Sequence, residues 1–83
     1  MKKNKSKEQL NLIGENIALA RKKAKMSQQK LSELLELEPV YVCRGSISRI
    51  EHGERAITDI EIKAIAKILK CSPNDLFGWE NDG

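Results

Sequence analysis

The residues best suited to chemistry lie in the segment RGSISRIEH, which runs from Arg44 to His52 in a chain of 83 residues. On a helix, at about 100° per residue, its apolar side chains fall on one side and its short polar ones on the other. The polar side and its flanks hold Arg44, Gly45, Ser46, Ser48, Arg49 and His52. An arginine among small residues can enter the major groove of DNA and donate two hydrogen bonds to guanine O6 and N7. The segment therefore predicts a helix that could read base edges.

The alternative for this segment alone is an ordinary amphipathic helix whose polar face is solvated. The surrounding chain favours the first interpretation. Gly53 supplies the left-handed residue that commonly ends a helix. An inner side made of Ile47, Ile50 and Glu51 can pack on the leucines of a preceding helix. A capped helix, a connection and a second short helix are typical of the helix-turn-helix arrangement.

Two helices are expected before this segment. The first has small and apolar residues at helical spacing, namely Ile13, Ile17, Ala20 and Ala24. The second, QQKLSELLE, begins after Ser27, which is a suitable N-cap. Its expected inner face holds Leu31, Leu34 and Leu35.

Two more helices are expected after it. Thr58 and Glu61 form a capping box at the start of the fourth. The start of the fifth is marked by Ser72, Pro73 and Asp75. No convincing β-alternation is present, so the sequence predicts an all-α domain of five helices with short connections.

The basic residues are concentrated at the beginning of the chain. Residues 1–30 carry nine basic and two acidic side chains, whereas residues 31–83 carry six and ten. This asymmetry suits a domain with one side that faces a polyanion. The alternative is a solvated lysine-rich tail, which composition alone would favour. With 40% apolar and 33% charged residues, the chain is expected to be soluble and globular, and the cytoplasm is its expected location.

Other classes of function find little support in the sequence. No long apolar run could span a membrane, and no nucleophile, base and phosphate-binding loop occur together, so neither an enzyme nor a cofactor is expected. Cys43 and Cys71 lack the spacing of a zinc site. Both cysteines are expected to be small buried residues. A disulfide between them and a redox role for Cys43 are the alternatives.

Three stretches, SQQKLSELL, SISRIEHGER and TDIEIKAIAKILKCSPNDLF, together resemble the lambda-repressor-like, Cro-type helix-turn-helix family, also called the xenobiotic-response-element type. The resemblance covers roughly residues 12–78. It implies a compact bundle of five helices and a transcriptional regulator. We expect a sequence-specific repressor that binds a double-stranded DNA operator. The recognition helix is expected at residues 44–52.

The resemblance also implies roles for single residues. The base-facing positions are Arg44, Gly45, Ser46, Ser48 and Arg49. Since Gly45 has no side chain, direct readout is expected from the two arginines. The DNA backbone is expected to contact Gln28, Lys30 and Arg55. Arg21 and Glu51 match an ion pair that braces the first helix against the third in several members of the family.

The chain departs from the family between its second and third helices. Glu36 stands where a glycine is common, and about five extra residues fall within LEPVYV. Pro39 should end the second helix before it. Tyr41 or Val42 is expected to tuck under the loop, because an exposed run of Val-Tyr-Val would be sticky. The glutamates of the segment would be repelled by phosphates, so this insertion, residues 36–43, is expected to lean away from DNA.

The last two helices are more apolar than one thin bundle needs. A homodimer surface is therefore expected at Ile60, Ile68, Phe77 and Trp79. The alternative is that the first and fifth helices cover these residues. The expected organisation is a flexible basic arm at residues 1–8, a DNA-binding domain at 9–79 and a polar end at 80–83. The competing function is a protein-binding module, such as an antitoxin or a regulator that acts mainly through a protein partner.

Overall fold

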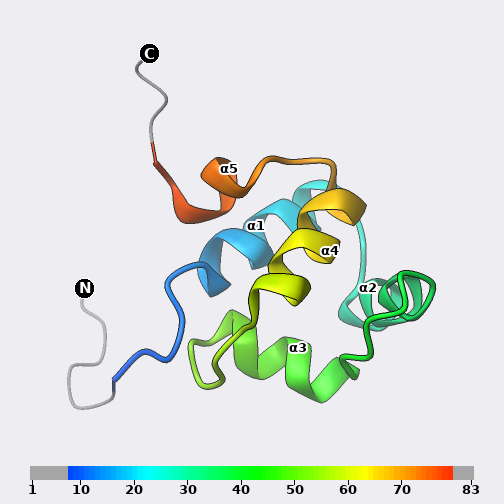
Figure 1. Cartoon of the computed structure of the whole chain (residues 1–83), viewed down its shortest axis with the longest axis horizontal. Helices are drawn as coiled ribbons and strands as arrows, with labels where there is room; N and C mark the ends of the chain where they lie inside the picture. Colours follow the sequence, from blue (N-terminus) through cyan, green and yellow to red (C-terminus); the bar gives the residue numbers. More distant parts are fainter. Residues whose placement is uncertain (1–7, 80–83) are drawn as a thin grey trace.

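The computed structural model describes residues 8–79, and five helices run through them (Figure 1). The helices are α1 (Gly14–Lys23), α2 (Gln28–Glu36), α3 (Arg44–Glu51), α4 (Asp59–Leu69) and α5 (Pro73–Phe77). Within the described range there is no strand, and the predicted all-α bundle of five helices is confirmed. The arm and polar end expected at the termini fall on residues 1–7 and 80–83, which lie outside the described residues.

Aliphatic side chains from all five helices meet in one core. The most deeply buried are Ile13, Ile17, Leu31, Leu35, Ile47, Ile50, Ile65 and Leu76. Full burial of one such side chain contributes about 1.5–3 kcal/mol relative to leaving it in water. α3 packs against α1 and α2, and it lies along one edge of the bundle with its outer side turned away from the other helices (Figure 1). Among residues 8–79, no helix is long and apolar enough to cross a membrane.

The first helix is shorter than its apolar pattern predicts. Ala24, expected on the inner face, is the exposed residue that follows α1, so that prediction is wrong. The reason is the left-handed conformation of Lys25, whose φ of 58° turns the chain away from the helix axis. Met26 packs against the core beyond this turn. Leu34 of α2 is likewise only half-buried.

Side-chain caps begin three of the helices where the sequence predicts them. The Ser27 hydroxyl accepts a hydrogen bond from the backbone N–H of Lys30 at 2.9 Å. Reciprocal capping boxes join Thr58 to Glu61 at α4 and Ser72 to Asp75 at α5. Caps of this kind typically stabilise a helix by about 1 kcal/mol each, and they fix where each element starts.

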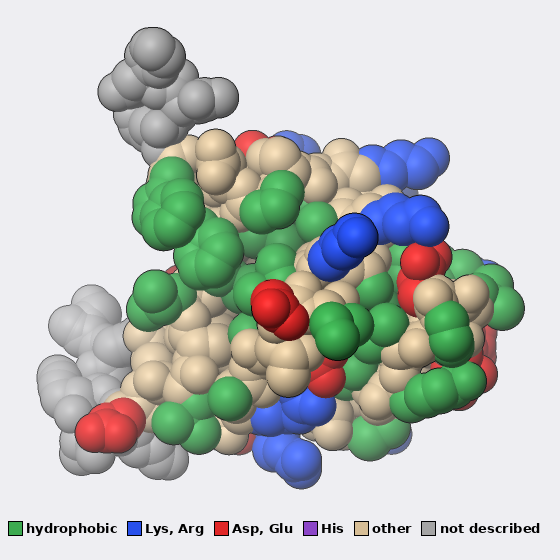
Figure 2. All heavy atoms as spheres, viewed as in Figure 1, with side chains coloured by type: hydrophobic (Ala, Val, Ile, Leu, Met, Phe, Trp, Pro, Cys, Tyr) green, Lys and Arg blue, Asp and Glu red, His purple; other side chains and the backbone are tan. Residues whose placement is uncertain are grey.

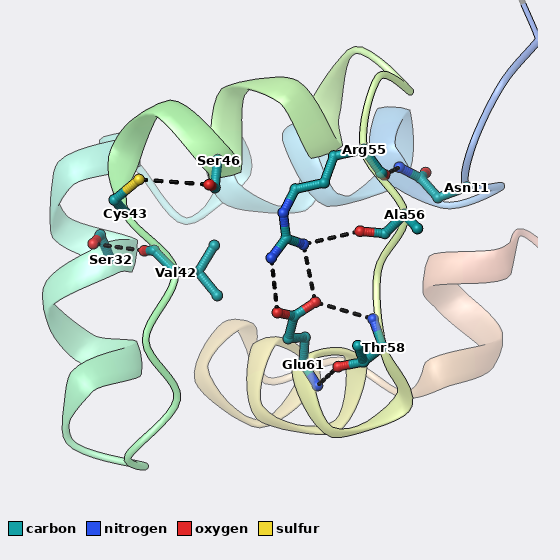
Figure 3. Close-up of polar contacts among 9 residues, drawn as sticks. All are labelled: Asn11, Ser32, Val42, Cys43, Ser46, Arg55, Ala56, Thr58 and Glu61. Carbon is teal, nitrogen blue, oxygen red and sulfur yellow. Dashed lines mark hydrogen bonds and ion pairs between the residues drawn. The ribbon is translucent and has the colours of Figure 1, made fainter.

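Hydrogen bonds between its backbone and α2 hold the inserted segment between α2 and α3 in place. The Val40 N–H donates to the Leu35 carbonyl at 2.7 Å, and the Ser32 hydroxyl donates to the Val42 carbonyl at 2.8 Å (Figure 3). Val42 is buried, whereas Tyr41 is 76% exposed. The side chain that seals the core is therefore Val42.

Further contacts hold the start of the insertion toward α4. α2 ends at Glu36, before Pro39, as predicted. The Lys67 ammonium on α4 donates to the Glu38 carboxylate at 3.2 Å. This pair draws the acidic side chain toward α4, on the other side of the bundle from the outer side of α3.

The two cysteines differ in exposure. Cys43 is exposed and Cys71 is half-buried, and both are free thiols. The expectation that Cys43 is buried is wrong. Cys43 itself has an extended backbone (φ −73°, ψ 166°), and its side chain is exposed next to the buried Val42, just as Tyr41 is exposed on the other side of Val42.

The start of α1 lies directly against the end of α3. A Cβ placed on Gly14 would overlap the Ile50 carbonyl oxygen and would also lie 3.1 Å from the Asn11 side-chain oxygen. Only a residue without a side chain permits this approach. Gly14 therefore sets the closeness of the two helices.

Replacing this glycine should be costly. We expect Gly14→Ala to lower the free energy of unfolding by about 1–3 kcal/mol, because the added methyl forces α1 and α3 apart. Chemical denaturation followed by circular dichroism measures the change. The matched control is Gly45→Ala on α3, where an added Cβ meets nothing within 4 Å. There alanine should stabilise the helix by about 0.5–1 kcal/mol. Equal effects at both glycines would contradict the close approach.

Candidate nucleic-acid interface

The outer side of α3 carries all the predicted base-facing residues. Arg44, Gly45 and Arg49 are exposed, and Ser46 and Ser48 are half-buried. Within residues 8–79, neither guanidinium group has a hydrogen-bond or ion-pair partner. The outer side is therefore a strip of small residues between two unpaired guanidinium groups.

The inner side of α3 holds the helix in place. Ile47 and Ile50 are almost fully buried, and Glu51 is 8% exposed. The partition of the helix into a buried and a polar side is thus the one that helical periodicity predicts. Because the inner side is fixed in the core, the direction in which the outer side points is fixed as well.

The ion pair expected between Arg21 and Glu51 is present and nearly buried. The Arg21 guanidinium donates through Nε at 2.7 Å and Nη2 at 3.0 Å to the two carboxylate oxygens. Its Nη1 donates to the Met26 carbonyl at 2.8 Å. Loss of one partner from a buried pair of this kind typically costs about 3–5 kcal/mol, because the other charge is left without compensation. The pair joins α1 to the end of α3.

Gln28, the first residue of α2, belongs to the same network. Its side-chain nitrogen donates to the Glu51 carboxylate at 2.9 Å. This amide therefore helps to satisfy the buried carboxylate. The role of Gln28 at the DNA backbone stays a prediction, as does that of the exposed Lys30.

Arg55, in the loop after α3, is held by α4. Its guanidinium donates two hydrogen bonds of 3.0 Å to the Glu61 carboxylate and one of 2.9 Å to the Ala56 carbonyl (Figure 3). Glu61 also accepts from the Thr58 N–H as part of the capping box. Sequence reasoning missed this pair. The available signal was an arginine just before a capping box whose carboxylate could accept from it. The phosphate contact expected of Arg55 stays a prediction.

Asn11 is the second residue that sequence reasoning missed. Its side chain is buried and contacts both the end of α3 and the loop that carries Arg55 (Figure 3). An asparagine shortly before a helix often accepts from the backbone N–H groups two and three residues further on, and this turn signal is recognisable in a sequence. Its contacts with distant backbone have no signature in the local sequence.

Cys43 precedes α3 without capping it. The thiol lies 3.5 Å from the Ser46 hydroxyl. Hydrogen bonds from the Ser46 hydroxyl and backbone N–H to the thiolate lower the pKa of Cys43. In contrast, burial raises the pKa of Cys71. A redox role for Cys43 stays a prediction. Among the described residues, no group of three or more histidine, cysteine or acidic side chains could hold a metal ion.

The far end of α3 is acidic. A cavity of about 440 Å³ lies there, and Glu8, Glu54 and His52 are among the residues that line it. The His52 ring nitrogen Nδ1 lies 2.8 Å from the Ser48 carbonyl oxygen. Carboxylates disfavour a nearby phosphate chain. The charge distribution therefore makes the beginning of α3, around Arg44, the better end for a polyanion.

The residues expected at a dimer surface are not all equally exposed. Ile60 is 67% and Trp79 62% exposed. Phe77 is half-buried and stacks on Trp79 with ring centroids 4.6 Å apart, whereas Ile68 is half-buried against the core. Figure 2 shows hydrophobic side chains gathered over the end of the molecule where α5 lies. An aromatic pair with one exposed member can serve as a contact surface.

The chain is similar to known helix-turn-helix proteins over most of its length. A family model described as Helix-turn-helix matches residues 17–76. The HTH-type transcriptional regulator DicA of Escherichia coli (strain K12) is 37% identical over 70 residues. The aligned region covers 83% of this chain and 48% of that protein, so the chain spans about half the length of the relative. No solved structure matched the chain.

The Arg55–Glu61 pair predicts a pH dependence of stability. Hydrogen bonds from Arg55 lower the pKa of Glu61 in the folded protein from the ordinary 4.5. A carboxyl group with a depressed folded pKa adds stability that is complete above its unfolded pKa and is lost as the pH falls through the folded pKa. We therefore expect stability to fall below about pH 4.5, and Glu61→Gln to flatten this acid limb.

Urea unfolding between pH 7 and pH 3 measures this difference. The control is Glu54→Gln, which removes an exposed carboxylate from the neighbouring loop. An acid limb of unchanged slope in Glu61→Gln would show that the Arg55 pair adds no stability.

Proposed function

This chain belongs to the helix-turn-helix family, and we propose that it binds a double-stranded DNA operator as a sequence-specific transcriptional regulator. One observation carries the proposal. The outer side of α3 presents two unpaired arginines with small residues between them, while a buried ion pair holds the inner side in place. The relative is named as a transcriptional regulator, which supports the same role.

In this proposal, α3 enters the major groove and its arginines read bases. A guanidinium can donate two parallel hydrogen bonds to guanine O6 and N7. Gly45 has no side chain, so the backbone of α3 can come close to the bases there. Ser46 and Ser48 can donate hydrogen bonds to bases or phosphates. Arg49 and Arg44 would then carry most of the direct readout.

The DNA backbone would be held on both sides of the groove. Lys30 and the first N–H groups of α2 suit one phosphate, since the beginning of a helix attracts anions. Arg55 suits another. Three of its five N–H groups are engaged with Glu61 and Ala56, which leaves two N–H donors for a phosphate oxygen. These contacts would supply affinity that falls steeply with salt.

We further propose that the regulator is a repressor that binds as a homodimer in the cytoplasm and has no catalytic role. The domain would comprise residues 9–79, between the basic arm at 1–8 and the polar end at 80–83. Two copies related by a two-fold axis would place their α3 helices about 34 Å apart, one turn of DNA. The exposed Ile60 and Trp79, with the half-buried Phe77, support such a contact.

The experiment that tests the function begins with selection of bound sites from a random DNA pool. On the selected operator, Arg49→Ala should cost about 1–3 kcal/mol of binding free energy, and much less on random DNA, because it removes a base contact. Fluorescence anisotropy measures both affinities. The control, Lys63→Ala, removes one exposed positive charge from α4 and should weaken both affinities only slightly.

Equal losses on both DNAs would remove Arg49 from base readout. If the selection enriches no DNA sequence, the proposal that this chain is a sequence-specific DNA-binding regulator is wrong. Retention of a protein partner without any footprint would then favour the competing protein-binding module.

The dimer makes a separate prediction. Trp79→Ser should weaken self-association in sedimentation equilibrium, since it removes a large apolar side chain from the contact. Tyr41→Ser is the matched control, because this aromatic residue is also exposed but lies in the insertion after α2. If the protein is monomeric at all concentrations, or if both variants associate equally well, the proposal of a dimer contact at Trp79 is wrong.

A further inference from the structure

One buried side chain links the recognition helix to the start of the bundle. Asn11 is 8% exposed and all of its hydrogen-bonding capacity is used. Its oxygen accepts from the N–H groups of Ile13 at 3.0 Å and Gly14 at 2.7 Å. Its nitrogen donates at 2.9 Å to the carbonyls of Ile50 and Arg55. One residue thus connects the beginning of α1, the end of α3 and the following loop.

The neighbouring contacts converge on the same place. The Leu10 N–H donates to the Gly53 carbonyl at 2.9 Å. Gly14 lies so close to the Ile50 carbonyl that no side chain fits between them. The last carbonyls of a helix lack partners within it. The Ile50 carbonyl accepts from the Gly53 N–H of the following turn at 3.0 Å and, as a second donor, from the distant Asn11 side chain. The end of α3 is therefore held both by its own turn and by the segment before α1.

The two carbonyls that Asn11 holds lie beside or within the residues that the proposed function turns toward DNA. Ile50 directly follows Arg49, so a shift of the Ile50 backbone carries Arg49 with it. The other carbonyl is that of Arg55 itself. Bidentate base contacts need placement to within about 0.5 Å, whereas attraction to phosphates acts over a Debye length of about 8–10 Å. Loss of this link should harm base reading more than general attraction.

We infer that Asn11 is a positioning residue for sequence recognition: through the carbonyls of Ile50 and Arg55 it holds α3 where Arg49 can read bases and the following loop where Arg55 can contact a phosphate. The inference rests on the proposed function, since the quantity it sets is the preference for operator over random DNA. Asn11 lies before residues 17–76 and so outside the helix-turn-helix match.

The chain offers a matched control in Asn16. Its side-chain nitrogen donates to the Leu76 carbonyl at 2.8 Å and so ties α1 to α5, away from α3. Asn16→Ala should destabilise the protein without moving the recognition helix. Asn11→Ala removes both the hydrogen bonds from Ile13 and Gly14 and the link to α3. Asn11→Asp keeps the oxygen that accepts from α1 but loses the donors, and it sets a carboxylate against two carbonyl oxygens.

The test measures the dissociation constants for the selected operator and for random duplex of equal length. They are measured at a temperature where circular dichroism shows each variant folded. We expect the operator-to-random ratio to fall about tenfold in Asn11→Ala and at least as far in Asn11→Asp, as for loss of one good base contact. Asn16→Ala should keep the wild-type ratio. If Asn11→Ala does not fold, Asn11→Asp carries the test.

A second readout requires no DNA. Residual dipolar couplings should report a changed orientation of α3 relative to α1 in both Asn11 variants and none in Asn16→Ala. A wild-type protein without operator preference would defeat the proposed function, while an unchanged α3 orientation in the Asn11 variants would defeat the positioning role. Wild-type ratios in the Asn11 variants, or an equal loss in Asn16→Ala, would also overturn it.

Discussion

The buried carboxylate of Glu51 is the constraint on which the position of α3 depends. A carboxylate removed from water is costly unless charge and hydrogen bonds compensate it. Three N–H donors from Arg21 and Gln28 converge on it, so α1, the start of α2 and the end of α3 must meet at one point. Apolar packing alone tolerates small rotations, whereas a bidentate ion pair has a direction. The core therefore holds the helices together, and the ion pair sets the rotation of α3.

Much of the fold is encoded in local patterns. The capping residues Ser27, Thr58 and Ser72 lie where short-range hydrogen bonds require them, and the apolar residues of α2, α3 and α4 follow helical spacing. The Arg21–Glu51 pair came from the resemblance to a family and not from the residues themselves. The polar side of α3 follows from periodicity, but its function rests on the surrounding helices.

Other features of the fold and of the candidate site could not be predicted from the sequence, because they depend on contacts between residues that are far apart in the chain. Asn11 bonds to carbonyls 39 and 44 residues away, and its local sequence shows at most a capping signal. The sequence alone shows no partner for Arg55, because the Glu61 carboxylate comes within reach of its guanidinium only in the folded protein. Cys43 is exposed because the burial of Val42 fixes the alternation of an inserted segment, whose path no helical pattern specifies.

Gly45 gives the molecule a further property. A side chain added there meets no neighbour within 4 Å, although the position lies in the middle of the proposed reading surface. Mutation at this site could therefore change which base pairs are preferred while the core, the ion pair and the caps stay the same. Under the proposed function, specificity could thus change at this position without a clash in the folded protein. During evolution, a single substitution at Gly45 could therefore change the preferred DNA sequence, and no intermediate variant would have to lose its fold.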